Sequence, residues 1–100
     1  MIQVVTVTSP QVQVALSGDI FAAEAKTIRE SLTGYIDRGH LFISIDLSQI
    51  NFIDSNGIQA LVFLHKQAMG KNGHVKIQGL QGKIKELFDL AELNKVLDIQ

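Results

Sequence analysis

The period of the hydrophobic pattern changes repeatedly along the chain, and the order of these periods constrains the fold more than any other feature. Residues 2–7 and 11–16 are rich in β-forming residues, and the second segment alternates apolar with polar or small side chains. Ser9 and Pro10 stand between them and favour a turn at the edge of a sheet. The chain is therefore predicted to begin with a β-hairpin.

Residues 22–38 have the helical period instead. Their apolar positions fall on one stripe, polar side chains cover the remaining surface, and Gly39 follows where a helix would end. The stripe consists of Ala25, Ile28, Leu32 and Ile36. Residues 41–47 then predict a strand that is apolar on both faces in its first half, as expected for the centre of a sheet covered by helices on two sides.

Helices and strands continue to alternate after this strand. The pattern predicts a helix over residues 55–69 that ends at Gly70, a strand over residues 74–78, and a third helix. The third helix is marked by Ile84, Leu87, Phe88 and Ala91. We therefore predict one α/β domain over residues 1–100, with a mixed, mainly parallel β-sheet, an N-terminal hairpin and helices packed on the sheet.

Composition excludes several classes of protein. One hundred residues form one domain, and 46% hydrophobic with 19% charged residues predicts a packed core. The absence of cysteine excludes disulfides and thiolate chemistry, and a formal net charge of -1 argues against a nucleic-acid partner. The longest apolar run, residues 60–64, is far shorter than the about 18 residues of a membrane span. We expect a soluble cytoplasmic protein without membrane insertion.

The sequence shows no catalytic, cofactor or metal motif. No Gly-x-Ser-x-Gly elbow surrounds Ser55, and the spacing of the histidines to this serine does not predict a base. The histidines are His40, His65 and His74. Because no pair of His, Asp or Glu residues has a familiar ligand spacing, we expect no metal, no cofactor and no enzymatic activity.

A polar group of residues, 54–57, separates the central strand from the second helix. The loop after a strand's carboxyl end leads into a helix N-terminus, where ligands and modifications tend to lie. Either Asp54 or Ser55 can cap this helix, so the sequence leaves open whether the Ser55 hydroxyl is a cap or is displayed.

Phe63 lies on the polar side of the second helix when residues are placed at the helical period. Its neighbours there include Gln59 and Lys66. The opposite, apolar face is predicted to contain Ile58, Leu61, Leu64, His65 and Ala68. An exposed phenylalanine about two turns from Ser55 is typical of a recognition surface.

The segment from Ile45 to Gly57 reads apolar-Asp-x-Ser-x-x-x-x-Ile-Asp-Ser-x-Gly, with "VALSGDI" upstream and "LAELNKVLDI" downstream. This pattern resembles the STAS domain of bacterial anti-sigma factor antagonists, and the resemblance covers essentially the whole chain. It implies phosphorylation of Ser55 as a switch in transcription regulation. Asp54 could disfavour the phosphate by repulsion, and Gly57, without a side chain, would let a kinase approach the hydroxyl closely. The unmodified form would bind an anti-sigma factor with serine kinase activity, and a serine phosphatase would restore it after phosphorylation. ATP would belong to the kinase, so this chain needs no cofactor of its own.

A partner-binding surface is expected around this serine. It comprises Asp19, Phe21, Asp54, Ser55, Asn56, Gly57, Gln59 and Phe63. The antagonists that the chain resembles commonly carry an acid at the position of Phe21, so this residue departs from their pattern. The alternative function is a constitutive adaptor subunit of a transport or other multiprotein complex, and a hydrolase that uses Ser55 ranks below both.

Overall fold

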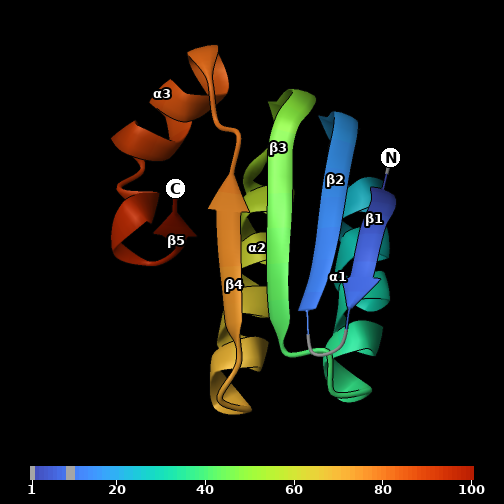
Figure 1. Cartoon of the computed structure of the whole chain (residues 1–100). Coiled ribbons are helices and arrows are strands. Elements are labelled where there is room, and N and C mark those ends of the chain that lie inside the picture. Colours follow the sequence, from blue (N-terminus) through green and yellow to red (C-terminus); the bar gives the residue numbers. More distant parts are fainter. Residues whose placement is uncertain (1, 9–10) are drawn as a thin grey trace.

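Within residues 2–8 and 11–100, which the computed structural model describes, five strands form one sheet in their order along the chain (Figure 1). The strands are β1 (Ile2–Thr8), β2 (Gln11–Ile20), β3 (Phe42–Ile53), β4 (His74–Gln78) and β5 (Asp98–Ile99). The helices are α1 (Ala22–Asp37), α2 (Ser55–Gly70) and α3 (Gly82–Leu90), followed by the 3-10 turn η1 (Leu93–Lys95).

The pairing of the strands confirms the predicted mixed, mainly parallel α/β sheet. β1 is antiparallel to β2, while β2, β3, β4 and β5 are mutually parallel neighbours. The predicted N-terminal hairpin is therefore present. Its predicted turn residues, Ser9 and Pro10, lie outside the described residues.

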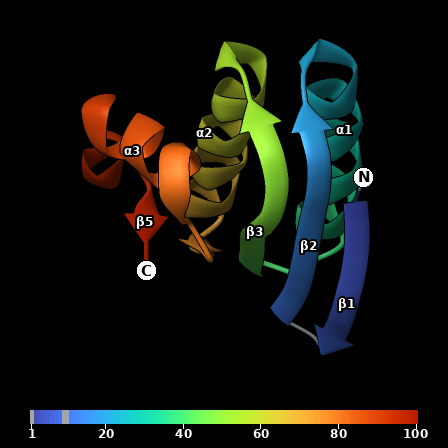
Figure 2. The same ribbon diagram turned by 90° about the horizontal axis from the view of Figure 1, so that it is seen from above.

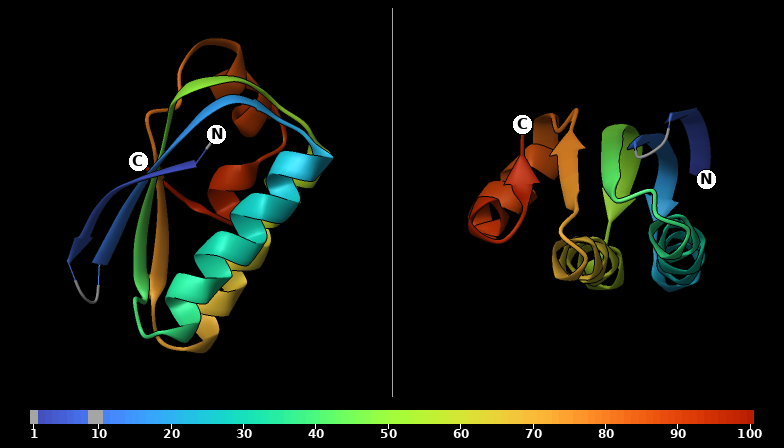
Figure 3. Two further views of the ribbon diagram at one scale, coloured as in Figure 1. Left: turned by 90° about the vertical axis from the view of Figure 1, so that its right-hand side faces the viewer. Right: turned by 60° about the horizontal axis from the view of Figure 1, so that its bottom comes forward.

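Helices α1 and α2 lie side by side on one face of the sheet (Figure 3). Connections between parallel strands are right-handed in nearly all proteins, so strands added in one direction, from β2 to β3 to β4, place both helices on the same face. The prediction that helices cover both faces of the central strand is therefore wrong. Phe42 of β3 is 42% exposed on the opposite face, whereas Ile43 and Ile45 are buried beneath the helices. We call this opposite face of β2, β3 and β4 the open face.

The core lies between the sheet and the two long helices. The predicted stripe of α1 is buried in full: Ala25, Ile28, Leu32 and Ile36. The buried residues of α2 are Gly57, Ala60, Leu61, Leu64 and Ala68, whereas the predicted Ile58 and His65 are only half-buried. Within the described ranges, no helix combines the length and the apolar character needed to cross a membrane.

β2 and β3 continue beyond their predicted ends, and β3 contains two bulges in this part of the pairing. The pairing register shifts between Ala15 and Ser17 and again between Gly18 and Asp19, so that the 12 residues of β3 span the 10 residues of β2. At the first bulge the Asp46 carboxylate accepts a hydrogen bond of 2.9 Å from the Ser48 amide. The Asp-x-Ser part of the sequence motif therefore has a structural role within β3.

The last helix and strand lie beyond β4, at the side of the sheet opposite β1 (Figure 2). β5 is joined to the sheet by a hydrogen bond of 2.8 Å from the Gln100 amide to the Ile77 carbonyl. The His74 Nε2 atom lies 2.5 Å from the Asp98 Oδ2 atom, and this hydrogen bond lowers the pKa of the Asp98 carboxyl. A strand of two residues carries no period, which is why the sequence did not predict it.

Candidate functional site

The carboxyl ends of β2 and β3 meet at one edge of the sheet, beside the first turns of α1 and α2 (Figure 2). Ile20 pairs with Ile53, and the Asp54 amide donates a hydrogen bond of 3.1 Å to the Ile20 carbonyl. Phe21 then leads into α1, and Asp54 leads into α2. The fold therefore brings the predicted residues Asp19 and Phe21 next to residues 54–57.

Asp54 is the cap of α2. Its Oδ1 atom accepts a hydrogen bond of 3.0 Å from the Gly57 amide, and its Oδ2 atom accepts one of 3.3 Å from the Asn56 side chain. Ser55 is the first helical residue and is exposed, and its hydroxyl has no hydrogen-bond partner among the described residues. The choice that the sequence left open is thereby resolved: Asp54 caps the helix and Ser55 is displayed.

Gly57 faces the core rather than the solvent. A Cβ atom at this position would lie 2.5 Å from Ile53 Cγ1 and 2.9 Å from Ile20 Cγ2, closer than real Cβ contacts. Glycine therefore lets the first turn of α2 pack directly on the ends of β2 and β3. Gly57 was expected to leave an open approach to the Ser55 hydroxyl, but its Cα faces the core and so does not border such an approach.

Two phenylalanine rings lie in contact at the same edge. Phe21 is 44% exposed and Phe52 is 47% exposed, and their ring centroids are 5.6 Å apart. All five phenylalanines lie in the described part of the chain, and only Phe88 is buried. Because aromatic side chains normally dominate cores and interfaces, this distribution favours a surface built for contact with another molecule.

Phe52 is a residue that the sequence reasoning missed. The second bulge of β3 turns its side chain outward, while Ile50 and Ile53 on either side are buried. The signal was the spacing of these two isoleucines, which lie three residues apart instead of the two residues of a regular strand. A break in alternation of this kind indicates a bulge.

The outer face of α2 extends this surface. Gln59 is exposed and Phe63 is 38% exposed, as predicted. The Arg29 guanidinium of α1 lies 5.8 Å from the centre of the Phe63 ring. Phe63 lies eight residues after Ser55, about 12 Å along the helix axis, so both can belong to one protein interface.

The charge around Ser55 is acidic. Residues 19–24 and 51–59 contain Asp19, Glu24 and Asp54 and no lysine, arginine or histidine. These segments therefore provide no basic side chain that could neutralise a phosphate on Ser55. The described residues also contain no group of three His, Cys, Asp or Glu side chains that could hold a metal ion.

Comparison with known proteins identifies relatives of this chain. The family model described as STAS domain matches residues 2–100. The anti-sigma-B factor antagonist of Bacillus subtilis is 28% identical over 88 residues, which cover 88% of this chain and 80% of that protein. The chain is thus similar to regulatory proteins along nearly its whole length.

Solved structures show the same fold. The unphosphorylated form of the anti-sigma factor antagonist SpoIIAA has a TM-score of 0.81 at 17% identity, covering 100% of this chain and 87% of that chain. The phosphorylated form of the Bacillus cell fate determinant SpoIIAA has a TM-score of 0.79 at 18% identity, covering 100% and 91%. At these identities the likeness establishes the fold alone.

Proposed function

The chain belongs to the STAS domain family, and on this premise we propose that it is a regulatory binding protein switched off by phosphorylation of Ser55. In this proposal the unmodified protein binds an anti-sigma factor that has serine kinase activity. Phosphorylation releases the partner, and a serine phosphatase restores binding. The curated relative of Bacillus subtilis is named as an anti-sigma-B factor antagonist, which supports this class of partner.

The observation that carries the proposal is the free, exposed Ser55 hydroxyl on the first turn of α2, beside a cap supplied by Asp54. A kinase needs an accessible hydroxyl, and because Asp54 supplies the cap, modification of Ser55 would break no hydrogen bond that holds the helix. The helix dipole stabilises an anion at this terminus by about 0.3–1 kcal/mol, so the domain should keep its fold when phosphorylated. A protein of the same fold has been solved in a phosphorylated form, which supports this expectation.

A phosphate on Ser55 would act mainly on the partner. It adds about -1.5 to -2 charges at pH 7 to an edge that already carries Asp19, Glu24 and Asp54. Burying this charge without a basic group to receive it costs several kcal/mol. A cost of about 3 kcal/mol weakens binding by roughly two orders of magnitude, enough for a switch.

The proposed partner-binding surface combines the displayed serine with aromatic side chains. It comprises Asp19, Phe21, Phe52, Asp54, Ser55, Asn56, Gln59 and Phe63, with Gly57 acting from beneath by fixing the helix start. The rings of Phe21 and Phe52 are the expected anchors because aromatic residues near the centre of an interface carry much of the binding energy. The acids would form its charged rim.

Incubation with ATP and the anti-sigma factor kinase of the source organism tests the switch. We expect phosphate on the wild-type protein and on Ser31→Ala, a control that removes another exposed serine, but none on Ser55→Ala. Equal labelling of Ser55→Ala would refute the assignment. Ser55→Asp is expected to bind the kinase at least about tenfold more weakly than wild type.

The alternative function, a constitutive adaptor, would use the same surface. The same variants distinguish it from the phosphorylation switch. The exposed pair Phe21 and Phe52 could hold a partner whatever the state of Ser55. Undiminished binding of Ser55→Asp to the purified partner would favour a constitutive adaptor over a switch.

A further inference from the structure

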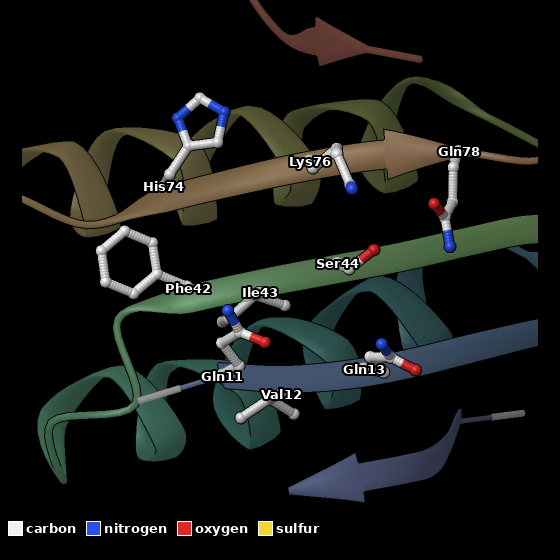
Figure 4. A pocket seen from close by; sticks show the side chains of 9 residues that line it. All are labelled: Gln11, Val12, Gln13, Phe42, Ile43, Ser44, His74, Lys76 and Gln78. Atoms are coloured by element: carbon white, nitrogen blue, oxygen red, sulfur yellow. The ribbon is translucent and has the colours of Figure 1, made fainter. Parts of the chain in front are cut away.

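The open face of the sheet contains a hollow that the Ser55 site does not use. It has a volume of about 260 Å³ and lies over β2, β3 and β4 (Figure 4). Drug-sized ligand pockets measure about 300–1,000 Å³, so this hollow has room for a small molecule only. Phe42 and Ser44 line it at the start of β3, whereas Asp54 follows the other end of this strand.

The hollow is lined by side chains that alternate away from the core. They include Gln11 and Gln13 of β2, Phe42 and Ser44 of β3, and Lys76 and Gln78 of β4. Figure 4 shows Lys76 and Gln78 leaning from β4 toward β3, and the Phe42 ring standing at the end of the hollow near the start of β3. Several polar groups and the Phe42 ring therefore line a single space.

Of the polar side chains in this lining, His74 is hydrogen-bonded to Asp98, whereas the others make no such contact with the described part of the chain. Among the described residues, the side chains of the three glutamines, Ser44 and Lys76 have no hydrogen-bond or ion-pair partner. Lys76 is nevertheless half-buried. A ligand that replaces water at these groups would meet an ammonium, a hydroxyl and three carboxamides.

The carboxylates that neighbour the hollow are already occupied. Asp98 stands opposite Lys76 in the sheet and is bound by His74, at 2.5 Å, and by the Gln100 side chain, at 2.6 Å. Asp46 stands opposite Gln78 and accepts from the Ser48 amide. No acid is among the residues that line the hollow. Besides the His74 hydrogen bond, the Lys76 charge helps to lower the pKa of the nearby Asp98 carboxyl, but the Lys76 and Asp98 side chains form no ion pair, so the ammonium can still bind a ligand.

We propose that this hollow binds a small organic anion that carries a flat apolar ring. The anionic group is held by Lys76 through charge-assisted hydrogen bonds, with Ser44 and the glutamine amides as neutral donors. The ring lies against Phe42, where aromatic stacking and burial of apolar surface stabilise it. Carboxylates and phosphate monoesters share this chemistry. The site does not depend on phosphorylation of Ser55.

Titrations of the ¹⁵N-labelled full chain with benzoate, phenyl phosphate, acetate and benzyl alcohol test the proposal by NMR. We expect saturable chemical-shift changes at amides of β2, β3 and β4 with at least one ring-bearing anion. Acetate and the neutral alcohol should bind more weakly. Lys76→Gln should weaken binding of the anion at least about tenfold, because a charged hydrogen-bond donor is lost. Lys66→Gln, an exposed lysine of α2, is the control and should leave the affinity unchanged.

Phe42 is tested by Phe42→Leu and Phe42→Ser, with unfolding curves measured alongside to establish that each variant is folded. Both variants should weaken the binding of a ring-bearing anion and leave the binding of acetate unchanged. The absence of saturable shifts with both benzoate and phenyl phosphate would overturn the proposal. Unchanged affinity in Lys76→Gln, or an equal loss in Lys66→Gln, would also overturn it. The preferred anion then identifies the carboxylate or the phosphate as the recognised group.

Discussion

Replacing Gly57 by alanine tests the packing that fixes the start of α2. The new Cβ atom would lie 2.5 Å from Ile53 Cγ1 and 2.9 Å from Ile20 Cγ2. Both isoleucines are 1% exposed, so neither can move into solvent to make room. Overpacking of a buried site costs about 1–3 kcal/mol.

The helix propensity of alanine offsets part of this cost. Alanine is favoured over glycine within a helix by about 0.5–1 kcal/mol. We therefore expect Gly57→Ala to lower the free energy of unfolding by about 1–2 kcal/mol. For a domain of 100 residues, such a loss lowers the melting temperature by roughly 4–16 °C.

Gly34→Ala is the matched control. Gly34 also lies within a helix, but its Cβ atom would meet only the flexible Arg38 side chain at 3.6 Å, an ordinary contact. This variant should gain about 0.5–1 kcal/mol. Urea unfolding followed by circular dichroism measures both variants. If Gly57→Ala is as stable as Gly34→Ala, the packing account of Gly57 is wrong.

Three further predictions concern the site and the C-terminal strand. Asp54→Ala should lower the free energy of unfolding by about 0.5–2 kcal/mol, with Asp54→Ser recovering most of it, because the cap is lost and then restored. Phe52→Ser should lower the free energy of unfolding by only about 0.5–1.5 kcal/mol, since the ring is half-exposed and contacts Phe21, yet weaken partner binding at least about tenfold in a calorimetric titration. Asp98→Asn should cost less than about 1 kcal/mol at neutral pH, because the His74 pair is partly exposed. Since folding lowers the pKa of Asp98 from 3.8, the difference between this variant and wild type should begin to shrink as the pH falls below 3.8 and should vanish below the pKa of the folded state. A difference that persists in strong acid would contradict the role of the pair.

The parts of the fold that follow from local pattern were predictable. The stripe of α1 is buried as predicted, and β4 spans the predicted residues 74–78, because in both segments burial follows the regular period. The bulges of β3 were not predictable in this way. They involve contacts such as the hydrogen bond from the Ser48 amide to Asp46, and the strand that contains them ends at Ile53 rather than at the predicted residue 47.

The sequence predicted where the candidate site lies, but not how its side chains are arranged. The motif placed Asp54 and Ser55 at a helix start, but only the position of the carboxylate beside the Gly57 amide shows which of them caps. The pair of Phe21 and Phe52 joins segments that are 31 positions apart, so no local pattern could reveal it. The open face was not predicted from the sequence, because helices on both faces of the sheet were inferred from the apolar pattern of a single strand. The direction in which successive strands are added to the sheet determines which face the helices cover.

The order of the strands in the sheet also bears on how the chain assembles during synthesis. Each strand neighbours the one that precedes it along the chain, so a growing chain never has to leave a gap for a segment that is still to be made. Parallel strands must still be brought together across the helix that connects them, and a domain generally folds as a unit. Each strand from β2 to β5 can nevertheless pair with a strand that has already been made, and β5 adds to the free edge of β4.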